Sequence, residues 1–469
     1  MLLYNSQTRK KEEFIPISPG KLKLYACGPT VYNYFHIGNA RAFLFFDVVR
    51  RFFQYRGYEV TYVQNITDID DKIIAQAQEE EVSYKTVADK YARAFLEDTA
   101  ALGITAPDVQ PRATDVVPEI TAYIEKLVQH GYAYEAGGDV YFDTTSLPSY
   151  GSLSGKKTEE QLVGARVAEN PYKRNPTDFT LWKHSKPGEP VWPSPWGEGR
   201  PGWHTECVVM SQMYLGETFD IHGGGSDLIF PHHENELAQA TALSGKPLAN
   251  YWMHNGFLNI EGEKMSKSLK NFFTARDILK DYDAETIRFF FLSKHYRSPI
   301  DFNRELIDES RKALGNFYAA LGVVDFLENR DAKPDLEPGN AEILRALEAD
   351  FITAMEDDFN TARAIAVLFE LSHKAKLDSN SSQLRLGAAQ LMVRLGSVLG
   401  FFSNLDERLG SRMPDLSKSL IELIISYRAE ARANKDWAAS DKFRNDLARL
   451  GIELKDTPEG CSWTIKEQK

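Results

Sequence analysis

Residues 22–66 decide the fold of this chain, and they read LKLYACGPTVYNYFHIGNARAFLFFDVVRRFFQYRGYEVTYVQNI. Leu22–Ala26 is mostly apolar and runs into the loop residues CGPT, a pattern typical of a buried strand that ends in a loop. Apolar residues and spaced arginines predict a helix over Ala40–Tyr55, and alternating β-branched and aromatic residues predict a strand over Tyr58–Ile66. Strand, helix and strand at this spacing indicate a βαβ unit, so we expect a parallel sheet.

The residues after this unit indicate that the parallel sheet is interrupted. Ile73–Leu102 is charged and is predicted to be helical. The region from about Arg112 to Arg200 shows a further βα-like pattern and then a stretch rich in Gly, Pro and Trp at Pro187–Trp203, which we interpret as an insertion. The sheet is expected to resume with a strand at Thr218–His222 that ends at Gly223-Gly224-Gly225.

The last third of the chain is predicted to be mainly helical. Ile307–Phe402 has few prolines, and Leu321–Leu327 and Ala362–Leu371 indicate packed helices of a bundle. From Leu416 onward we expect a helical pair and then two short strands, 451–454 and 462–465. The chain is therefore predicted to have an α/β fold with a split parallel sheet, a helical bundle and a small α+β module.

Bulk composition limits the function classes. The chain has 469 residues, which suggests roughly three domains. The formal net charge of -12 does not favour a nucleic-acid partner, but phosphate contact needs only a local basic strip. Three scattered cysteines, Cys27, Cys207 and Cys461, are too few for a disulfide framework. The first 14 residues do not resemble a signal peptide, and no apolar run approaches ~20 residues, so we expect a cytoplasmic protein without a membrane span.

His36-Ile37-Gly38-Asn39 lies between the first predicted strand and its helix. Glycine lets a nucleotide approach the backbone, the helix N-terminus favours phosphate, and a histidine can donate to phosphoryl oxygens. By itself the motif is weak evidence, because a capped turn that happens to contain a histidine is by far the more common explanation.

A second motif, Lys264-Met265-Ser266-Lys267-Ser268, follows Glu261-Gly262-Glu263. Two lysines among small hydroxyl residues on a loop suit a polyphosphate clamp, although a lone charged pentamer is more often a solvated loop. Together, in this order and on either side of a split sheet, the two motifs resemble the HIGH and KMSKS signatures of class I aminoacyl-tRNA synthetases. Asn39 replaces the second histidine of HIGH and cannot carry charge.

A third group consists of Cys27, Cys207, His232 and Glu236. Residues four apart on a helix share one face, so His232 and Glu236 could bind one metal together. Thiolate, imidazole and carboxylate are all zinc ligands. Each residue alone is more simply a buried thiol or a surface acid, and their spacing does not define a site.

Longer segments resemble bacterial cysteinyl-tRNA synthetases over nearly the whole chain. The matching segments are Leu24–Gly38 (LYACGPTVYNYFHIG), Asn65–Lys72 (NITDIDDK), Gly202–Met210 (GWHTECVVM), Phe219–Glu236 (FDIHGGGSDLIFPHHENE), Lys264–Ser268 and His295–Pro299 (HYRSP). The resemblance implies one zinc ion held by Cys27, Cys207, His232 and Glu236, which selects the substrate thiol. Gly225, Asp227 and His232 also fit the pattern GxDxxxxH, which resembles a class I nucleotide-site motif.

The resemblance further implies activation of L-cysteine by ATP, with Mg²⁺, and transfer to tRNA(Cys). The residues implied in catalysis are His36, Gly38, Asn39, Lys264 and Lys267. Those implied in ATP binding are His36, Gly38, Gly223, Gly224, Gly225, Asp227 and Lys267. The residues expected around the substrate cysteine are Thr67, Trp203, His204, His222 and His233, each of which could equally be structural.

The same resemblance gives an expected domain map. A Rossmann-type catalytic domain comprises residues 1–112 and 201–260 and is split by a connective-peptide insertion at 113–200. A KMSKS loop and stem-contact region (261–306), a helical domain (307–402) and a C-terminal anticodon-binding module (403–469) follow. In that module, basic residues suit phosphates and an aromatic residue suits base stacking. These residues are Arg428, Arg432, Lys435, Lys442, Arg444 and Trp463. Acidic residues alternate with them, which favours a solvated helix face for most of the charges.

Two other functions share these motifs. A ligase that joins cysteine to a glucosamine-inositol acceptor has the same catalytic motifs, but it is shorter and lacks an anticodon module. A regulatory protein with an inactive synthetase fold would not need an intact Lys264–Ser268 and four zinc candidates. We therefore expect a monomeric cysteine–tRNA ligase.

Overall fold

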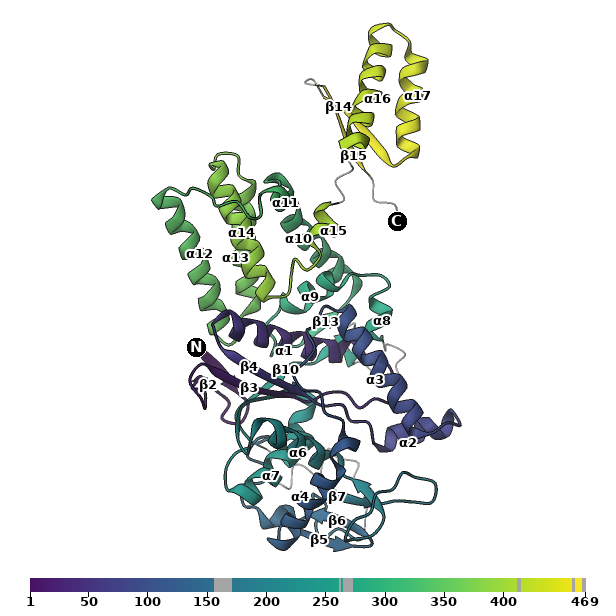
Figure 1. The fold of residues 1–469 in the computed structure, drawn as a ribbon, viewed down its shortest axis with the longest axis vertical. Helices are drawn as coiled ribbons and strands as arrows, with labels where there is room; N and C mark the ends of the chain where they lie inside the picture. Colours follow the sequence, from purple (N-terminus) through teal and green to yellow (C-terminus); the bar gives the residue numbers. More distant parts are fainter. Residues whose placement is uncertain (156–170, 261–262, 265–272, 411–414, 458–459, 466–469) are drawn as a thin grey trace. The chain divides into compact units, whose positions relative to one another are not determined.

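The computed structural model describes residues 1–155, 171–260, 263–264, 273–410, 415–457 and 460–465 (Figure 1). The chain divides into two compact units, Met1–Ser403 and Asn404–Lys469. Among the described residues, no helix combines the length and the apolar character needed to cross a membrane.

A parallel four-stranded sheet forms the centre of the first unit. Its strand order is β10-β9-β3-β4, and the strands are β3 (Lys21–Ala26), β4 (Glu59–Gln64), β9 (Phe219–Gly225) and β10 (Ala249–Asn255). Helix α1 (Ile37–Tyr55) covers one face, and α6 (Trp203–Leu215) and α7 (Glu234–Ser244) lie on the other (Figure 1). The predicted βαβ unit and the parallel sheet are confirmed. All four strands are parallel, so their carboxyl ends share one edge, where open α/β sheets bind ligands.

The helical stretch after β4 is two helices rather than one. Helix α2 (Asp71–Glu79) ends before Glu81, whose φ of 54° lies in the left-handed region, and Ser83 caps α3 (Tyr84–Ala101). The chain then makes a short helical turn, η1 (Ala113–Val116), and α4 (Val117–Gln129).

The insertion departs from the predicted βα-like pattern. Its sheet is antiparallel, in the order β5 (Ala133–Ala136), β6 (Asp139–Phe142), β7 (Phe179–His184) and β8 (Gly199–Pro201), with the turn η2 (Thr144–Ser146) after β6. Gly137 and Gly138 join β5 to β6, both with positive φ, which is the backbone that a two-residue hairpin requires.

Small elements surround the sheet. The N-terminal hairpin pairs β1 (Leu2–Asn5) with β2 (Lys10–Glu13). Two turns, η3 (Ser226–Leu228) and η4 (Ile229–His233), connect β9 to α7. After β10, a second small sheet pairs β11 (Leu258–Ile260) with β12 (Glu263–Lys264) and β13 (Ile300–Phe302), and it is accompanied by α8 (Ala275–Ile278) and α9 (Ala284–Leu292).

The predicted helical region is present, with one correction. It comprises α10 (Arg304–Val323), α11 (Phe326–Asn329), α12 (Pro338–Glu356), α13 (Thr361–Lys376) and α14 (Ser382–Val398). The prediction of one helix over Leu321–Leu327 is wrong, because α10 ends at Val323 and Asp325 has a φ of 48°. Continuation of the helix through Asp325 is therefore excluded.

The second unit contains α15 (Leu405–Gly410), α16 (Asp415–Ala433) and α17 (Trp437–Arg449), followed by an antiparallel pair, β14 (Ile452–Thr457) and β15 (Gly460–Ile465). The helical pair and both short strands are as predicted. Ile421, Leu447 and Ile452 form its small core, and Trp463 packs against them.

Candidate metal centre and nucleotide cleft

Four elements bring the predicted metal ligands together. Cys27 directly follows β3, and Cys207 lies in the second turn of α6, which begins after Gly202. His232 lies in η4, and Glu236 lies in the first turn of α7. Their candidate ligand atoms all lie within 4.8 Å of one another, and all four residues are buried. Residues that are 209 positions apart in the sequence therefore meet at the carboxyl edge of the sheet.

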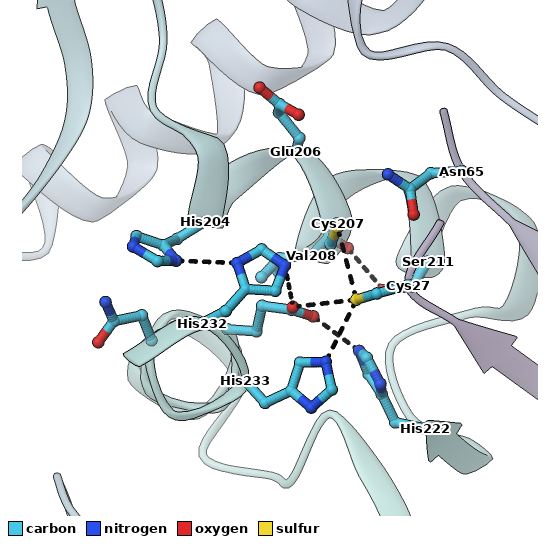
Figure 2. A network of polar contacts seen from close by, with 12 residues as sticks. Cys27, Asn65, His204, Glu206, Cys207, Val208, Ser211, His222, His232 and His233 are labelled. Carbon is cyan, nitrogen blue, oxygen red and sulfur yellow. Dashed lines mark hydrogen bonds and ion pairs between the residues drawn. The ribbon is translucent and has the colours of Figure 1, made fainter. Parts of the chain in front are cut away.

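The distances within this cluster are those of ligands around a common point (Figure 2). The Cys27 sulfur lies 3.9 Å from the Cys207 sulfur and 3.6 Å from Oε1 of Glu236. Nε2 of His232 lies 2.9 Å from the same carboxylate oxygen. That nitrogen is fully buried, yet it makes no hydrogen bond of acceptable geometry to any described residue. A cation between these atoms would satisfy it, and two sulfurs, one imidazole and one carboxylate suit zinc.

Electrostatics also favour a cation at this point. A hydrogen bond from Cys27 is the largest influence on the Cys207 thiol and lowers its pKa to about 6. Burial opposes the charged form of His232, but the charges of Glu236 and Cys207 outweigh it and raise the His232 pKa to about 10. Burial raises the pKa of Cys27, so the buried negative charge of the cluster lies on Glu236 and Cys207, and protons and a metal ion compete for the same atoms.

Outer residues orient these ligands. Nε2 of His222 lies 2.7 Å from Oε2 of Glu236, and Nδ1 of His204 lies 3.0 Å from Nδ1 of His232. Nε2 of His233 lies 3.3 Å from the Cys27 sulfur. Because of these positions, Cys27, His222, His233 and Glu236 form an overlapping second group of candidate ligands. The first group has two sulfurs and the more common zinc chemistry, so we assign His222 and His233 to the outer layer.

One cavity of about 330 Å³ links the metal centre to the nucleotide motif. Cys27 lines it, as do His36, Gly38 and Asn39 at the start of α1, and Asp227 after β9. Trp203 lines the cavity as well, and its ring stacks on His232 with centroids 3.9 Å apart. Thr67 is buried and its hydroxyl donates a hydrogen bond to Glu206 at 3.1 Å, and its contact with the substrate stays a prediction.

The three glycines after His222 have different surroundings. A side chain at Gly223 would lie 2.0 Å from the Phe46 ring of α1, and one at Gly224 would lie 2.9 Å from the His233 ring. These two glycines are closely packed within the sheet, and their role in ATP binding stays a prediction. Gly225 lines the cavity together with Asp227.

His36 caps α1 as well as lining the cavity. Its Nδ1 accepts the backbone N–H of Asn39 at 3.2 Å, so the ring proton belongs on Nε2. Burial lowers the pKa of His36 to about 4 despite the nearby charge of Asp227. His36 is therefore a neutral donor at pH 7.

Only part of the second motif belongs to the described residues. The backbone of Lys264 belongs to β12 and pairs with Asn259. Its side chain, and all of Lys267, lie outside the described residues.

The structure revises the expected nucleic-acid residues of the second unit. Arg428 is buried, and its guanidinium holds both oxygens of Asp456 at 2.7 and 2.8 Å. Arg432 contacts the same carboxylate, and Trp463 is partly buried and packs against the small core. Sequence reasoning missed Trp437, which is 60% exposed at the start of α17. Its position between two predicted helices was the available signal.

The sequence was compared with protein families and with known proteins. Residues 13–312 match the family described as tRNA synthetases class I (C) catalytic domain, and residues 350–403 match the DALR domain. A cysteine–tRNA ligase of Pelobacter propionicus is 48% identical over 489 residues, and one of Clostridioides difficile is 48% identical over 468 residues. Each comparison covers 99% of both chains.

Solved structures of other synthetases share the fold. A Mycobacterium tuberculosis methionyl-tRNA synthetase in complex with methionyl-adenylate has a TM-score of 0.59 at 15% identity, over 86% of this chain and 94% of the other. A leucyl-tRNA synthetase (LeuRS) from Agrobacterium radiobacter, in a ternary complex, has a TM-score of 0.64 at 12% identity, over 86% of each chain.

Proposed function

Because this chain belongs to the cysteine–tRNA ligase family of class I tRNA synthetases, we propose that it joins L-cysteine to tRNA(Cys) in two steps, the first of which consumes ATP, with zinc selecting the substrate thiol. In the first step the cysteine carboxylate attacks the α-phosphate of ATP, forming cysteinyl-adenylate and releasing pyrophosphate. In the second step a hydroxyl of the terminal ribose of the tRNA takes the cysteinyl group, the bond between that group and the phosphate breaks, and AMP leaves. We propose a monomer acting in the cytoplasm.

One observation carries this proposal: Cys27, one of the four clustered candidate ligands, lines the same cavity as the nucleotide motif. Cys27, Cys207, His232 and Glu236 would hold the zinc ion. A bound zinc ion offers a coordination position to a thiolate, which serine, with a harder and far less acidic hydroxyl, cannot match. Thiol recognition and phosphate chemistry would then take place within one cavity.

The chain's own groups position the phosphates. Neutral His36 presents its Nε2 proton as a donor to a phosphoryl oxygen, and the N-terminus of α1 attracts the same negative charge. Lys267, assisted by Lys264, is proposed to engage the α-phosphate and the leaving pyrophosphate, with Mg²⁺ accompanying ATP. Gly225 and Asp227 border the cavity where the ribose would lie. Little covalent work is left to the protein, so positioning and charge stabilisation dominate.

We assign tRNA contact to the helical domain and to the second unit. An exposed tryptophan suits stacking on an unpaired base, and Trp437 has that exposure, with Lys435 also exposed nearby. The glucosamine-inositol ligase is not favoured, because both cysteine–tRNA ligases align over 99% of this chain, including its last unit.

The decisive experiment compares cysteine with serine in tRNA charging, with zinc content measured on the same sample. We expect discrimination of the order of 10⁴ or more in favour of cysteine and one zinc per chain. Cys207→Ser should lose zinc and weaken cysteine binding far more than ATP binding. Cys461→Ser is the matched control, because Cys461 lies in the second unit, and it should retain both. Equal loss of cysteine and ATP binding in Cys207→Ser would indicate misfolding and count against thiol selection.

A separate variant tests the phosphate clamp. Lys267→Ala should lower kcat for cysteine-dependent pyrophosphate exchange while zinc content stays unchanged. A variant that exchanged pyrophosphate with wild-type kcat would remove Lys267 from the mechanism.

A further inference from the structure

Asn255 is buried at the edge of the nucleotide cavity, and within the described part of the chain its side-chain amide has no partner. It ends β10, it is 3% exposed, and it borders the cavity that also contains His36 and Asp227. Neither Nδ2 nor Oδ1 of its amide has a hydrogen-bond partner among the described residues. A buried amide without partners costs of the order of several kcal/mol, so such a group in a native fold requires an explanation.

The direction of this amide follows from the strand. Side chains alternate along β10, and Nε2 of His254 lies 2.8 Å from Nδ1 of His233, on the face that carries the metal centre. Asn255 therefore points to the opposite face, which α1 covers. Its register partner is Gly225, in the same row as Gly223, which packs against Phe46 of α1. Asn39, Ala42 and Phe43 of α1 line the cavity on this face.

The backbone next to Asn255 is held firmly. The guanidinium of Arg41, on α1, donates to the carbonyl oxygens of Gly256 at 2.8 Å and Phe257 at 3.1 Å. Arg41 also donates to the carbonyls of His295 and Ser298. The chain beyond Asn255 is thus fixed before any ligand binds, which suits a residue that must present two polar atoms in a defined direction.

We propose that Asn255 reads the adenine base of ATP and so determines the nucleotide specificity of the ligase; this rests on the proposed function. An amide offers one acceptor and one donor side by side. Adenine presents the complement, an exocyclic N6 amine beside an unprotonated ring nitrogen, and asparagine is the side chain that pairs with adenine in this way elsewhere. Phosphate offers only acceptors, and the proposed function already assigns the ribose to the part of the cavity that Gly225 and Asp227 line.

A nucleotide without the amine separates base reading from a structural role. Purine riboside triphosphate lacks only the N6 amine, and its equilibrium binding can be compared with that of ATP. Wild-type protein should bind it about tenfold more weakly than ATP. Asn255→Leu should bind ATP about ten- to hundredfold more weakly and should no longer distinguish the two nucleotides, while the KM for cysteine stays near wild type.

Stability provides the second measurement. Asn255→Leu removes an unpartnered amide, so the unliganded variant should unfold at the same temperature as wild type or higher. Asn5→Leu is the matched control, because Asn5 is equally buried but its amide bonds to Glu12 and Asn250 and lies outside the cavity lining. That control should lose stability and keep the nucleotide preference.

Three results would overturn the inference. The wild-type protein could bind ATP and purine riboside triphosphate equally, or Asn255→Leu could keep the preference for ATP. The third is an Asn255→Leu variant that loses stability as Asn5→Leu does while its preference for ATP is unchanged. If Asn255→Leu does not fold, Asn255→Ala is subject to the same comparison. Binding needs no turnover, so a wild type inactive in pyrophosphate exchange would refute the proposed ligase separately from base reading.

Discussion

At the scale of single residues, the metal centre depends on groups that would not touch the metal. His204 is half-buried, and its only described ring-nitrogen contact with another side chain is the one to Nδ1 of His232. Burial, the largest influence, lowers the pKa of His204 to about 3, so it is neutral and can orient the His232 ring without repelling a cation. Outer groups of this kind commonly contribute a factor of about 10–100 to metal affinity.

We therefore expect His204→Leu to bind zinc about 10- to 100-fold more weakly while leaving ATP affinity unchanged. Competition against a chelating indicator measures this directly. His184→Leu is the control, because His184 is exposed and belongs to the insertion sheet. Wild-type zinc affinity in His204→Leu would show that Trp203 stacking alone orients His232.

His36 has a structural role as the N-cap of α1 and a proposed catalytic role, and two substitutions can separate the two. His36→Asn keeps an N-cap acceptor for α1 but lacks the Nε2 proton, whereas His36→Ala loses both. We expect both variants to lose about 10²–10³ in kcat for pyrophosphate exchange, and His36→Ala alone to lose about 1 kcal/mol of stability. Pre-steady-state kinetics and urea unfolding measure the two effects.

The loss in kcat caused by substituting His36 should not depend on pH near neutrality. Because the His36 pKa is lowered to about 4, the ring stays neutral from pH 8 to pH 5.5. The ratio of wild-type to variant kcat should therefore stay constant across that range. A ratio that falls as pH drops through 6.5 would mean that His36 titrates normally and that its burial has been misjudged.

At the scale of elements, one buried ion pair ties α1 to α9. Nη1 of Arg288 lies 2.8 Å from Oδ2 of Asp47, and neither side chain is more than 1% exposed. Arg288 also donates to the carbonyls of Gly103, after α3, and Leu399, after α14. This arginine therefore fastens the helical domain to the helix that carries the nucleotide motif.

Removing the carboxylate should be severe, because it leaves a buried cation without its partner. We expect Asp47→Asn to lower the free energy of unfolding by about 3–5 kcal/mol at neutral pH. The exposed pair Lys246–Glu217 provides the contrast, and Glu217→Gln should change stability by less than about 1 kcal/mol. Urea denaturation of the three proteins at pH 7.5 makes the comparison.

The ion pair between Asp47 and Arg288 also predicts how the difference in unfolding free energy between wild type and Asp47→Asn depends on pH. Burial raises the pKa of Asp47, but the charges of Arg288 and Arg51 outweigh it and hold the pKa below its ordinary value. Its stabilisation is thus complete above pH 3.8 and is lost only as pH falls through the lower folded value. The gap between wild type and Asp47→Asn should be constant from pH 7.5 to pH 5, and a gap that closes in that range would contradict the assignment.

Helices and strands that follow from the periodicity of apolar residues could be predicted from the sequence. Helix ends that depend on the φ angle of a single residue could not. The βαβ unit at residues 22–66 follows from periodicity alone. The antiparallel insertion could have been inferred from Gly137-Gly138 between two short apolar runs, which is a hairpin signal. The break at Asp325 could not, because a left-handed aspartate has no sequence signature that distinguishes it from a helical one.

Site residues follow the same division. The zinc candidates are spread over 209 positions, so spacing could not assemble them, and the resemblance to a known family did so. The environment of the remaining residues follows from packing, which the sequence does not show. Gly223 and Gly224 leave room for the rings of Phe46 and His233. Asn255 became a candidate only because its buried amide has no partner among the described residues.

At the scale of the whole molecule, we expect the two compact units to have different functions, cysteine activation in the first and tRNA recognition in the second. The metal centre, the cavity and His36 all belong to residues 1–403, whereas residues 404–469 have a small core of their own. Cysteine activation needs only ATP and cysteine, so its machinery is complete in the first unit. Recognition of tRNA needs surface in addition to the cavity.

A chain that ends at Ser403 should therefore retain cysteine-dependent pyrophosphate exchange within a few-fold of wild type and lose most of its kcat/KM for tRNA charging. Trp437→Ala in the full chain refines the test, because loss of one stacked base costs about 1–3 kcal/mol, or roughly 5- to 150-fold in tRNA affinity. Trp463→Ala would instead disturb the core of that unit and lower its stability. If the shortened chain loses exchange as well, the second unit supports the cavity itself, and the division between activation and tRNA recognition does not hold.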